Sequence, residues 1–583
     1  MALAMERVAE LAVDLILPSV GLAEAVEERL RGWEATGFAE RLWEKDPTLW
    51  APDLDESPLP SELADRLGWL DLPESMAVEA GELADFAEEA RRDGVRCVAV
   101  LGMGGSSLAP EVFQGVFRAR PGALELVVLD STHPEAVRSA RDRLDLAAHP
   151  ERTLFLVASK SGTTVETLSL FHFFWAEAAA AAPDPGARFA AITDPGTPLA
   201  DLAGERGFRR VFLAPPDVGG RFSALSAFGL VPAALAGIDL VRLAPRGRFR
   251  APAPENPALR LGALLAEAAL ARAGGGAFGR RAGRVRDKLT LLTSPGLASL
   301  PVWIEQLVAE SLGKDGRGVV PVVGDPALAP GEYHDDRLFV HLGLAEDGSA
   351  SAAGTLAALE AAGHPVAQVV LRDRYGLGAC MLLWEVAVAA AGAAMGVNPF
   401  DQPDVELAKR RAKEAMAGAS RGGAGGSSEA EEVAAGDTAR LRQAVERWIE
   451  PAGPGRYAAI QAFLPQDNGT DHGIEELRLL LADRTGIATS AGYGPRFLHS
   501  TGQLHKGGPP SGLFLQLVDE PAVELPVPGA GHGFGELIRA QALGDYRALR
   551  ERGRSVLRVQ LGADRTRGLA HLREALEAAL GEL

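Results

Sequence analysis

Short apolar runs alternate with longer amphipathic stretches over most of the chain. Runs that predict buried strands lie at residues 97–101, 124–129, 153–158, 189–192, 211–213, 289–293, 338–342, 366–371, 457–463, 512–517 and 555–561. Helical patterns separate them, the clearest in the C-terminal part being 474–485, 534–552 and 566–580. Strands that alternate with helices are typical of parallel sheets covered on both faces. We therefore expect an α/β protein.

The pattern and the local composition predict five ranges. Residues 1–90 read as an N-terminal helical segment, and Glu6, Glu10 and Asp14 among the apolar residues of 1–16 predict an amphipathic helix, not a signal peptide. Residues 91–245 and 246–416 predict two α/β lobes of the same architecture. Residues 417–436, rich in Gly, Ala, Ser and Glu, predict a flexible linker, and residues 437–583 predict a smaller C-terminal α/β unit.

Composition narrows the class of protein. The 583 residues carry 59 basic and 78 acidic side chains, a formal net charge of −19, which disfavours nucleic acids and anionic membranes as partners. Cys97 and Cys380 are the two cysteines, too few for a disulfide framework or a C-x-x-C zinc site. The apolar run 379–396 contains Glu385 and is rich in alanine, which favours a packed helix over a membrane span. We expect a soluble, cytoplasmic protein.

A glycine-rich turn follows the first predicted strand, at Gly102-Met-Gly-Gly-Ser-Ser107. Glycines allow the backbone to turn tightly and to approach a ligand, and serine hydroxyls add donors, so Gly105 and Ser106 are candidate ligand contacts. A tight strand-to-helix turn without a ligand explains the same residues. The spacing does not match the G-x-G-x-x-G dinucleotide pattern, because Ser107 occupies the third glycine position.

A hydroxyl-rich loop follows the predicted strand 153–158. Ser159, Lys160, Ser161, Thr164 and Thr167 surround the start of the next helix, where Thr163 and Glu166 have the spacing of a capping box. Free N–H groups, the positive end of the helix dipole, several hydroxyls and one lysine suit a phosphate monoester. A P-loop lysine is absent, so a nucleoside triphosphate is not indicated.

Several segments, taken in order, resemble the signature segments of glucose-6-phosphate isomerases. They are Gly102–Ser107, Asp130-Ser-Thr-His133, Ser159–Thr164, Gly219-Gly-Arg-Phe-Ser223, Glu310-Ser-Leu-Gly-Lys314 and the stretch from Asn398 to Lys409. The resemblance covers about residues 40–415 and implies two sugar-isomerase lobes in a homodimer with active sites at the subunit interface. From residue 42 the chain is most similar to the isomerase half of fused transaldolase–isomerase proteins. About 40 residues precede that point, so we expect no transaldolase activity.

The resemblance also implies roles. Glu310, late in the apolar stretch 300–312, would be the base that removes a carbon-bound proton, and Arg221 would stabilise the enediolate. Gln402 would bind sugar hydroxyls and Lys409 would act at the ring oxygen. The residues alone leave other readings open: an exposed helix glutamate, a loop arginine, and a solvated Glu406–Lys409 pair.

The ring-opening histidine has no match in its usual place. The family carries it in a Gly-Gln-His setting between the glutamate and glutamine segments, and no histidine there has that setting in this chain. His499 and His505, in the C-terminal unit, lie in a segment whose continuation, residues 509–552, resembles the stretch after the family's histidine. The order is permuted, and either histidine could instead be a structural loop residue.

The predicted activity is interconversion of glucose 6-phosphate and fructose 6-phosphate by ring opening and proton transfer through an enediolate, with no metal or redox cofactor. The predicted partner is the hexose 6-phosphate. Alternatives are a related isomerase for mannose 6-phosphate or glucosamine 6-phosphate, a non-catalytic sugar-phosphate sensor, and an oxidoreductase that uses a nicotinamide.

Overall fold

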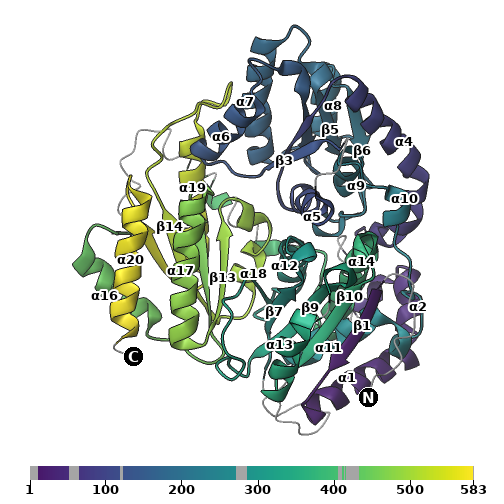
Figure 1. The fold of residues 1–583 in the computed structure, drawn as a ribbon, viewed down its shortest axis with the longest axis vertical. Helices are drawn as coiled ribbons and strands as arrows, with labels where there is room; N and C mark the ends of the chain where they lie inside the picture. Colours follow the sequence, from purple (N-terminus) through teal and green to yellow (C-terminus); the bar gives the residue numbers. More distant parts are fainter. Residues whose placement is uncertain are drawn as a thin grey trace.

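Three units, each built on a five-stranded sheet, make up the computed structural model (Figure 1). The structure describes residues 11–51, 63, 65–118, 123–270, 285–348, 350–404, 410–412, 414, 416 and 432–581. In Figure 1 the first lobe lies at the top, the second lobe at the lower right and the C-terminal unit at the left. The predicted α/β class with two lobes and a third α/β unit is confirmed.

The sheet of the first lobe has the order β3-β2-β4-β5-β6 and is parallel throughout. Its strands are β2 (Cys97–Gly102), β3 (Glu125–Leu129), β4 (Thr153–Ala158), β5 (Phe189–Thr193) and β6 (Arg210–Leu213). Its helices are α4 (Leu72–Arg92), α5 (Leu108–Phe117), α6 (Pro134–Leu144), α7 (Val165–Ala181), α8 (Pro198–Glu205), α9 (Ala227–Leu235) and α10 (Leu240–Leu243). Each predicted strand of this lobe agrees with the structure to within one residue at either end, because buried parallel strands are continuous apolar runs.

The sheet of the second lobe has the order β1-β10-β9-β7-β8. Its strands are β1 (Leu11–Ile16), β7 (Lys288–Thr293), β8 (Val320–Val323), β9 (Arg337–Leu344) and β10 (Val366–Leu371). Its helices are α1 (Val20–Ala35), α2 (Phe38–Trp43), α11 (Pro257–Leu270), α12 (Leu300–Leu312), α13 (Ala350–Ala361) and α14 (Leu377–Met395). The sequence pattern does not predict β8, because this strand is four residues long and contains Pro321. A proline is tolerated there because β8 lies at the edge of the sheet.

The helix predicted over residues 1–16 is wrong for the part that the structure describes. Residues 11–16 form β1, which adds antiparallel to β10 with Leu11 opposite Leu371. The acidic residues at every fourth position imitate one face of a helix, but residues 11–16 contain five apolar residues and one charged residue, Asp14. Such a short apolar run also fits a strand, and the open edge of β10 selects it.

The C-terminal unit has the parallel sheet β11-β15-β14-β12-β13. Its strands are β11 (Glu432–Ala434), β12 (Tyr457–Phe463), β13 (Ala488–Tyr493), β14 (Gly512–Val518) and β15 (Ser555–Gln560). Its helices are α16 (Thr438–Ile449), α17 (Asn468–Thr485), α18 (Gly502–Gly507), α19 (Phe534–Glu551) and α20 (Arg565–Leu580). Strand β11 lies inside the range 417–436 that composition predicts as a linker, and residues 417–431 of that range lie outside the described residues.

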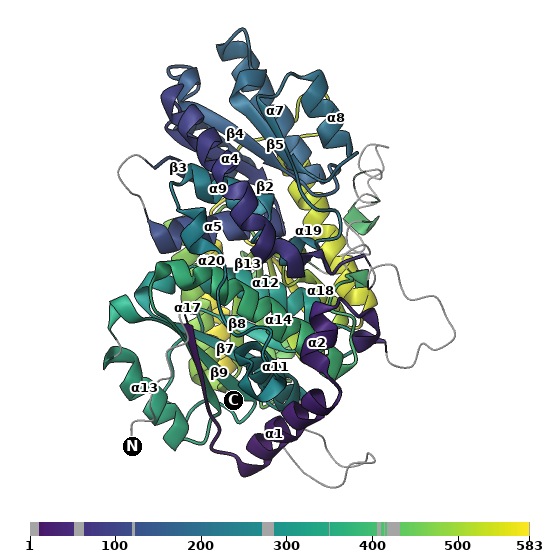
Figure 2. The same cartoon turned by 90° about the vertical axis from the view of Figure 1, so that its right-hand side faces the viewer.

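Hydrogen bonds and an aromatic contact join the C-terminal unit to the two lobes. At the second lobe, Arg478 of α17 donates to the backbone oxygen of Val323, 2.8 Å away, and Asp325 accepts from Thr489 N–H of β13 at 3.2 Å. At the first lobe, the ring of Phe534 at the start of α19 packs edge-on against Phe173 of α7, with centroids 5.8 Å apart. Figure 2 shows α19 extending up to the first lobe beside α18. The third unit is thus part of one body with the lobes.

All three sheets share one strand order. In β3-β2-β4-β5, β8-β7-β9-β10 and β13-β12-β14-β15, the first of these four strands along the chain lies between the second and the third. The connection after the first of these strands therefore runs toward one edge of the sheet, and the next connection runs toward the other edge. The switch point lies between β2 and β4 in the first lobe, between β7 and β9 in the second, and between β12 and β14 in the C-terminal unit. Ligands of open parallel sheets bind at such switch points, beyond the carboxyl ends of the strands.

Two helices fill the middle of the molecule. α12 lies between the three units, near the centre of Figure 1, and Glu310 in its last turn is buried. The helical stretch Arg374–Met395, which contains α14, is the one helix among the described residues that is long and apolar enough to cross a membrane. Because 89% of its most apolar window is buried inside the protein, it packs as a core helix, as predicted for residues 379–396.

Candidate active site

The glycine turn and the hydroxyl loop lie side by side at the switch point of the first lobe. β2 pairs with β4, with Gly102 opposite Ala158, so the segments that follow the two strands emerge next to each other. The turn then forms a short 3-10 helix at Gly104–Ser106 before α5, and the loop leads into α7. Two helix starts and their free N–H groups converge here.

The hydroxyls of the loop are arranged in pairs. Ser159 Oγ lies 3.0 Å from Thr164 Oγ1, and Ser161 Oγ lies 2.9 Å from Thr163 Oγ1. Thr167 is fully buried, and its Oγ1 has no hydrogen-bond partner among the described residues. A buried hydroxyl without a partner costs free energy unless a ligand completes its bonds. The unpartnered hydroxyl of Thr167 makes the loop a candidate oxyanion site.

Lys160 points toward a neighbouring loop. Its Nζ forms an ion pair with Asp194 and donates to the backbone oxygen of Pro216, 3.1 Å away. Its charge is therefore already partnered in this structure. It can still add positive potential beside the loop.

Two glycines of the turn allow other backbone segments to approach. A Cβ atom at Gly105 would lie 2.0 Å from the backbone oxygen of Gly220, and one at Gly104, whose φ is +57°, would lie 2.8 Å from that of His499. Neither approach is open to a residue with a side chain. The turn thus brings the loop of Arg221 and the loop of His499 to the same place.

Arg221 and Glu310 form a buried ion pair. Arg221 Nη1 lies 3.3 Å from Glu310 Oε2, and both side chains are about 95% buried. Arg221 also donates to Ser311 Oγ at 2.9 Å and to the backbone oxygens of Pro399 and Asp401, the latter at 2.8 Å. The guanidinium of Arg221 therefore contacts two other segments that resemble the family. Ser311 lies 90 residues after Arg221 in the sequence, and Asp401 lies 180 residues after it.

Burial tunes the ionisable groups of this cluster. It raises the pKa of Glu310 above the usual carboxyl range, and the charges of Arg221 and His499 partly oppose that rise. It also lowers the pKa of Lys314 to about 7, although Asp401 favours the charged form. Lys314 Nζ donates to the backbone oxygen of Asp401 at 2.7 Å and pairs with its carboxylate. A base with a raised pKa suits proton abstraction from carbon near neutral pH.

His499 is held by Glu166. Its Nε2 lies 3.0 Å from Glu166 Oε1, which also accepts from Gln541 Nε2 at 2.7 Å. Gln541 Oε1 in turn accepts from Thr132 at 2.8 Å. The backbone oxygen of His499 accepts from Gln306 of α12 at 2.8 Å. These contacts fix both the ring and the loop of His499 beside the glycine turn.

The predicted capping box is wrong. The N-cap of α7 is Thr164, not Thr163, and its side chain makes no capping bond. Glu166, which the box would turn back to the helix start, instead binds His499 and Gln541 across the junction with the C-terminal unit. Sequence spacing cannot show a partner 333 residues away, so the role of Glu166 was missed. The one feature of the sequence that could have indicated this role is the position of Glu166, two residues after the N-cap Thr164 of the hydroxyl-rich loop.

His505 lies in the core of the C-terminal unit. Its ring is 4% exposed, packs against Phe497 and Phe514, and has Gln461 Nε2 3.1 Å from its Nδ1. Burial holds its pKa well below the usual range of histidine, with Lys506 and Arg554 nearby. A neutral, enclosed ring of this kind supports packing.

The glutamine segment lies next to the same cluster. Gln402 is exposed and follows Asp401, whose backbone oxygen binds both Arg221 and Lys314. The helix that follows starts at Pro403. Lys409 lies outside the described residues. Ser106 and Gly105 are buried in the turn itself.

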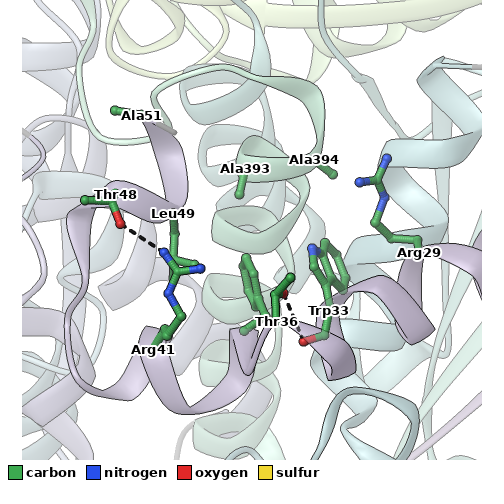
Figure 3. Close-up of a pocket in the computed structure, with 10 residues that line it drawn as sticks. Arg29, Trp33, Thr36, Arg41, Thr48, Leu49, Ala51, Ala393 and Ala394 are labelled. Carbon is green, nitrogen blue, oxygen red and sulfur yellow. Dashed lines mark hydrogen bonds between the residues drawn. The ribbon is translucent and has the colours of Figure 1, made fainter. Parts of the chain in front are cut away.

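A separate cavity of about 360 Å³ opens among α1, α2 and α14 (Figure 3). Arg29, Trp33 and Arg41 line it, but Glu267 pairs with Arg29 and Asp46 with Arg41. It includes none of the predicted site residues. We therefore place the candidate active site at the switch point of the first lobe.

Comparisons of sequence identify relatives with a known name. A family model described as phosphoglucose isomerase matches residues 75–244. A glucose-6-phosphate isomerase from Rubrobacter xylanophilus is 31% identical over 400 residues, which are 60% of this chain and 88% of the relative. One from Thermus thermophilus is 30% identical over 433 residues, which are 66% of this chain and 98% of the relative.

Solved structures agree on the fold. A hypothetical protein from Thermus thermophilus superposes with a TM-score of 0.56 at 27% identity, over 70% of this chain and all of that one. A glucose-6-phosphate isomerase from Chlamydia trachomatis superposes with a TM-score of 0.53 at 20% identity, over 70% of this chain and 89% of that one. Because relatives of that name are at least 30% identical and are covered over 88% and 98% of their length, the chain belongs to the glucose-6-phosphate isomerase family.

Proposed function

We propose that this chain interconverts glucose 6-phosphate and fructose 6-phosphate. The observation that carries the proposal is the buried carboxylate of Glu310, whose Oε2 lies 3.3 Å from Arg221 Nη1. The hydroxyl loop of the first lobe, where Thr167 Oγ1 has no partner among the described residues, supports it. A carbon acid next to a carbonyl needs a base of raised pKa, a positive group for the developing oxyanion and an anchor for the phosphate. We assign these roles to Glu310, Arg221 and the hydroxyl loop 159–167.

Proton transfer uses Glu310 and Arg221. The carboxylate of Glu310 takes the proton from C2 of the open-chain aldose, the electrons move into an enediolate, and the same carboxyl returns the proton to C1. The hydroxyl and carbonyl oxygens exchange one proton, so the reaction is balanced without an oxidant. Arg221 stabilises the enediolate through its second Nη1 N–H, because its other donors hold Ser311 and the backbone of Pro399 and Asp401.

Ring opening uses His499. Glu166 binds Nε2 of His499 at 3.0 Å, which leaves Nδ1 as the ring nitrogen that exchanges a proton with the sugar ring. A carboxylate partner stabilises the imidazolium and fixes the ring orientation. We assign no chemical role to His505, because it is enclosed in the core of the C-terminal unit.

Binding uses the switch point of the first lobe. The phosphate sits on the hydroxyls of Ser159, Ser161, Thr164 and Thr167 and on the N–H groups of the two helix starts, with Ser106 and Gly105 alongside and Lys160 adding positive potential. Gln402 contacts sugar hydroxyls. Lys409 acts at the ring oxygen, an assignment that rests on the family resemblance.

We also propose a cytoplasmic homodimer, as in the family. Glu310, Arg221, Glu166 and His499 all come from one chain here, so each subunit would build its own set of these groups. The hexose 6-phosphate is the proposed partner.

A coupled assay tests the proposal. The purified protein should convert fructose 6-phosphate to glucose 6-phosphate at a rate that saturates with substrate, while Glu310→Gln should not. Binding without turnover in the wild type would support a sugar-phosphate sensor. Turnover of mannose 6-phosphate or glucosamine 6-phosphate in place of fructose 6-phosphate would assign a different isomerase.

A further inference from the structure

Gln503 is not among the predicted site residues, and its side chain makes three hydrogen bonds. It lies in α18, fully buried, at the junction of the C-terminal unit with the second lobe. Its Oε1 accepts from Asp404 N–H at 2.9 Å, and its Nε2 donates to Asp404 Oδ2 at 2.8 Å and to the backbone oxygen of Gly313 at 3.2 Å. Both Nε2 hydrogens and one acceptor site are thus in use.

The two partners of Gln503 belong to different catalytic segments. Gly313 caps the C-terminus of α12, three residues after Glu310. Asp404 lies two residues after Gln402, at the start of the next helix. Gln503 itself follows His499 by four residues. One amide therefore joins the segments that carry the proposed base, the proposed sugar contact and the proposed ring-opening histidine.

Two glycines allow the backbone and Asp404 to lie close together around the Gln503 amide. A Cβ atom at Gly313 would lie 2.6 Å from the Cα of Leu504, and one at Gly507 would lie 2.3 Å from Asp404 Oδ2. Asp404 is buried, and Arg552 binds its second carboxylate oxygen. The close contact of α18 with the end of α12 thus depends on two glycines and one fully paired carboxylate.

We propose that Gln503 is a positioning residue that holds the Gln402 segment against the helix of Glu310. The proposal rests on the proposed isomerase function. A misplacement of reacting groups by about 1 Å can cost on the order of a hundredfold in rate. The phosphate loop lies on the first lobe, whereas the partners of Gln503 belong to the second, so phosphate binding should not depend on this amide.

The first test removes the amide. Gln503→Met keeps the length of the side chain and removes all three bonds. Gln516→Met is the matched control, because Gln516 is an equally buried glutamine of β14 whose amide oxygen binds Arg558 instead. Turnover of fructose 6-phosphate, the inhibition constant of inorganic phosphate and the urea midpoint are measured for both variants and the wild type.

We expect Gln503→Met to lower kcat at least tenfold relative to Gln516→Met, with the inhibition constant of phosphate changed less than twofold. A kcat within twofold of the control would overturn the proposal. So would a parallel loss of phosphate affinity and urea midpoint, since that pattern indicates general unfolding. An inactive wild type would instead refute the isomerase function.

A second test remains if Gln503→Met does not fold. Gln503→Glu sets a carboxylate against that of Asp404, and adding Asp404→Asn restores a donor across the same contact. The double variant should recover kcat at least threefold over Gln503→Glu. A double variant no faster than the single one would overturn the positioning role.

Discussion

His499 Nε2 lies 3.0 Å from Glu166 Oε1, although 333 residues separate the two along the chain. Glu166 lies in the first turn of α7 of the first lobe, and His499 ends a short 3-10 helix of the C-terminal unit. The contact therefore exists only when the C-terminal unit is docked on the first lobe. If His499 opens the sugar ring, as we propose, that step depends on the junction between these units.

His499→Ala should slow turnover of cyclic glucose 6-phosphate strongly, while exchange of the carbon-bound proton on an open-chain substrate continues through Glu310. The expected loss on the cyclic substrate is on the order of a hundredfold or more. Proton exchange with deuterated solvent and steady-state rates measure the two steps separately.

His505→Ala is the comparison variant. It should lower the urea midpoint, because it leaves a cavity beside Phe514. It should affect cyclic and open-chain substrates alike. A selective loss of ring opening in His505→Ala would reverse our assignment of the two histidines.

Glu310→Gln should lower kcat by a factor on the order of 10² to 10⁴, since the amide cannot accept the carbon-bound proton. Affinity for substrate should stay within a few-fold, because the phosphate loop and Gln402 are untouched. Equilibrium binding and turnover are measured in parallel. Glu360→Gln, an exposed carboxylate of α13, serves as the control and should behave as the wild type. Normal turnover in Glu310→Gln would exclude it as the base.

Thr167→Val should weaken binding of inorganic phosphate by about tenfold or more without lowering the urea midpoint. The hydroxyl has no partner within the described part of the chain, so its removal should cost the folded protein nothing. Thr197→Val is the opposite case, because Thr197 Oγ1 bonds Thr193 at 2.7 Å. That control should lose stability and keep its phosphate affinity. Unchanged phosphate binding in Thr167→Val would remove the loop from the phosphate site.

Glu305 should make stability depend on pH. Burial raises its pKa to about 7 against the opposing charges of Arg496 and Arg478, whereas an unfolded glutamate titrates near 4.3. Between these values the folded state holds a proton that the unfolded state has lost. The free energy of unfolding therefore falls as pH rises through this window.

Glu305→Gln removes that dependence. Urea midpoints measured from about pH 5 to about pH 8 should fall less in the variant than in the wild type. Glu360→Gln should keep the wild-type slope. Identical slopes in Glu305→Gln and the wild type would show that Glu305 does not titrate in this range.

The sequence predicts features formed by neighbouring residues, but it does not predict contacts between residues that are far apart in the chain. β4 and the hydroxyl loop are contiguous, so their apolar run and hydroxyl spacing locate the candidate phosphate site without a structure. His499 and His505 share one glycine-rich segment, and their different burial arises from packing against Glu166 in one case and Phe514 in the other. The bonds of Gln503 to Asp404 span 99 residues and leave no pattern in the sequence.

Two other predictions are wrong: the helix at residues 11–16 and the capping box at Thr163 and Glu166. β1 is a strand because β10 offers an unpaired edge, and its own residues fit a helix as well. Glu166 has the spacing of a cap, but the partly buried imidazole of His499 and the buried amide of Gln541 compete for its carboxylate. In both cases a tertiary partner outweighs a local preference worth about 1 kcal/mol.

The C-terminal unit provides His499 to the site from within the same chain, and this has a kinetic consequence. Completing the set of Glu166, Glu310, Arg221 and His499 requires one polypeptide to fold on itself, with no encounter between two. After dilution from denaturant, the docking of the C-terminal unit on the first lobe should follow a first-order time course whose rate constant is the same at nanomolar and micromolar protein.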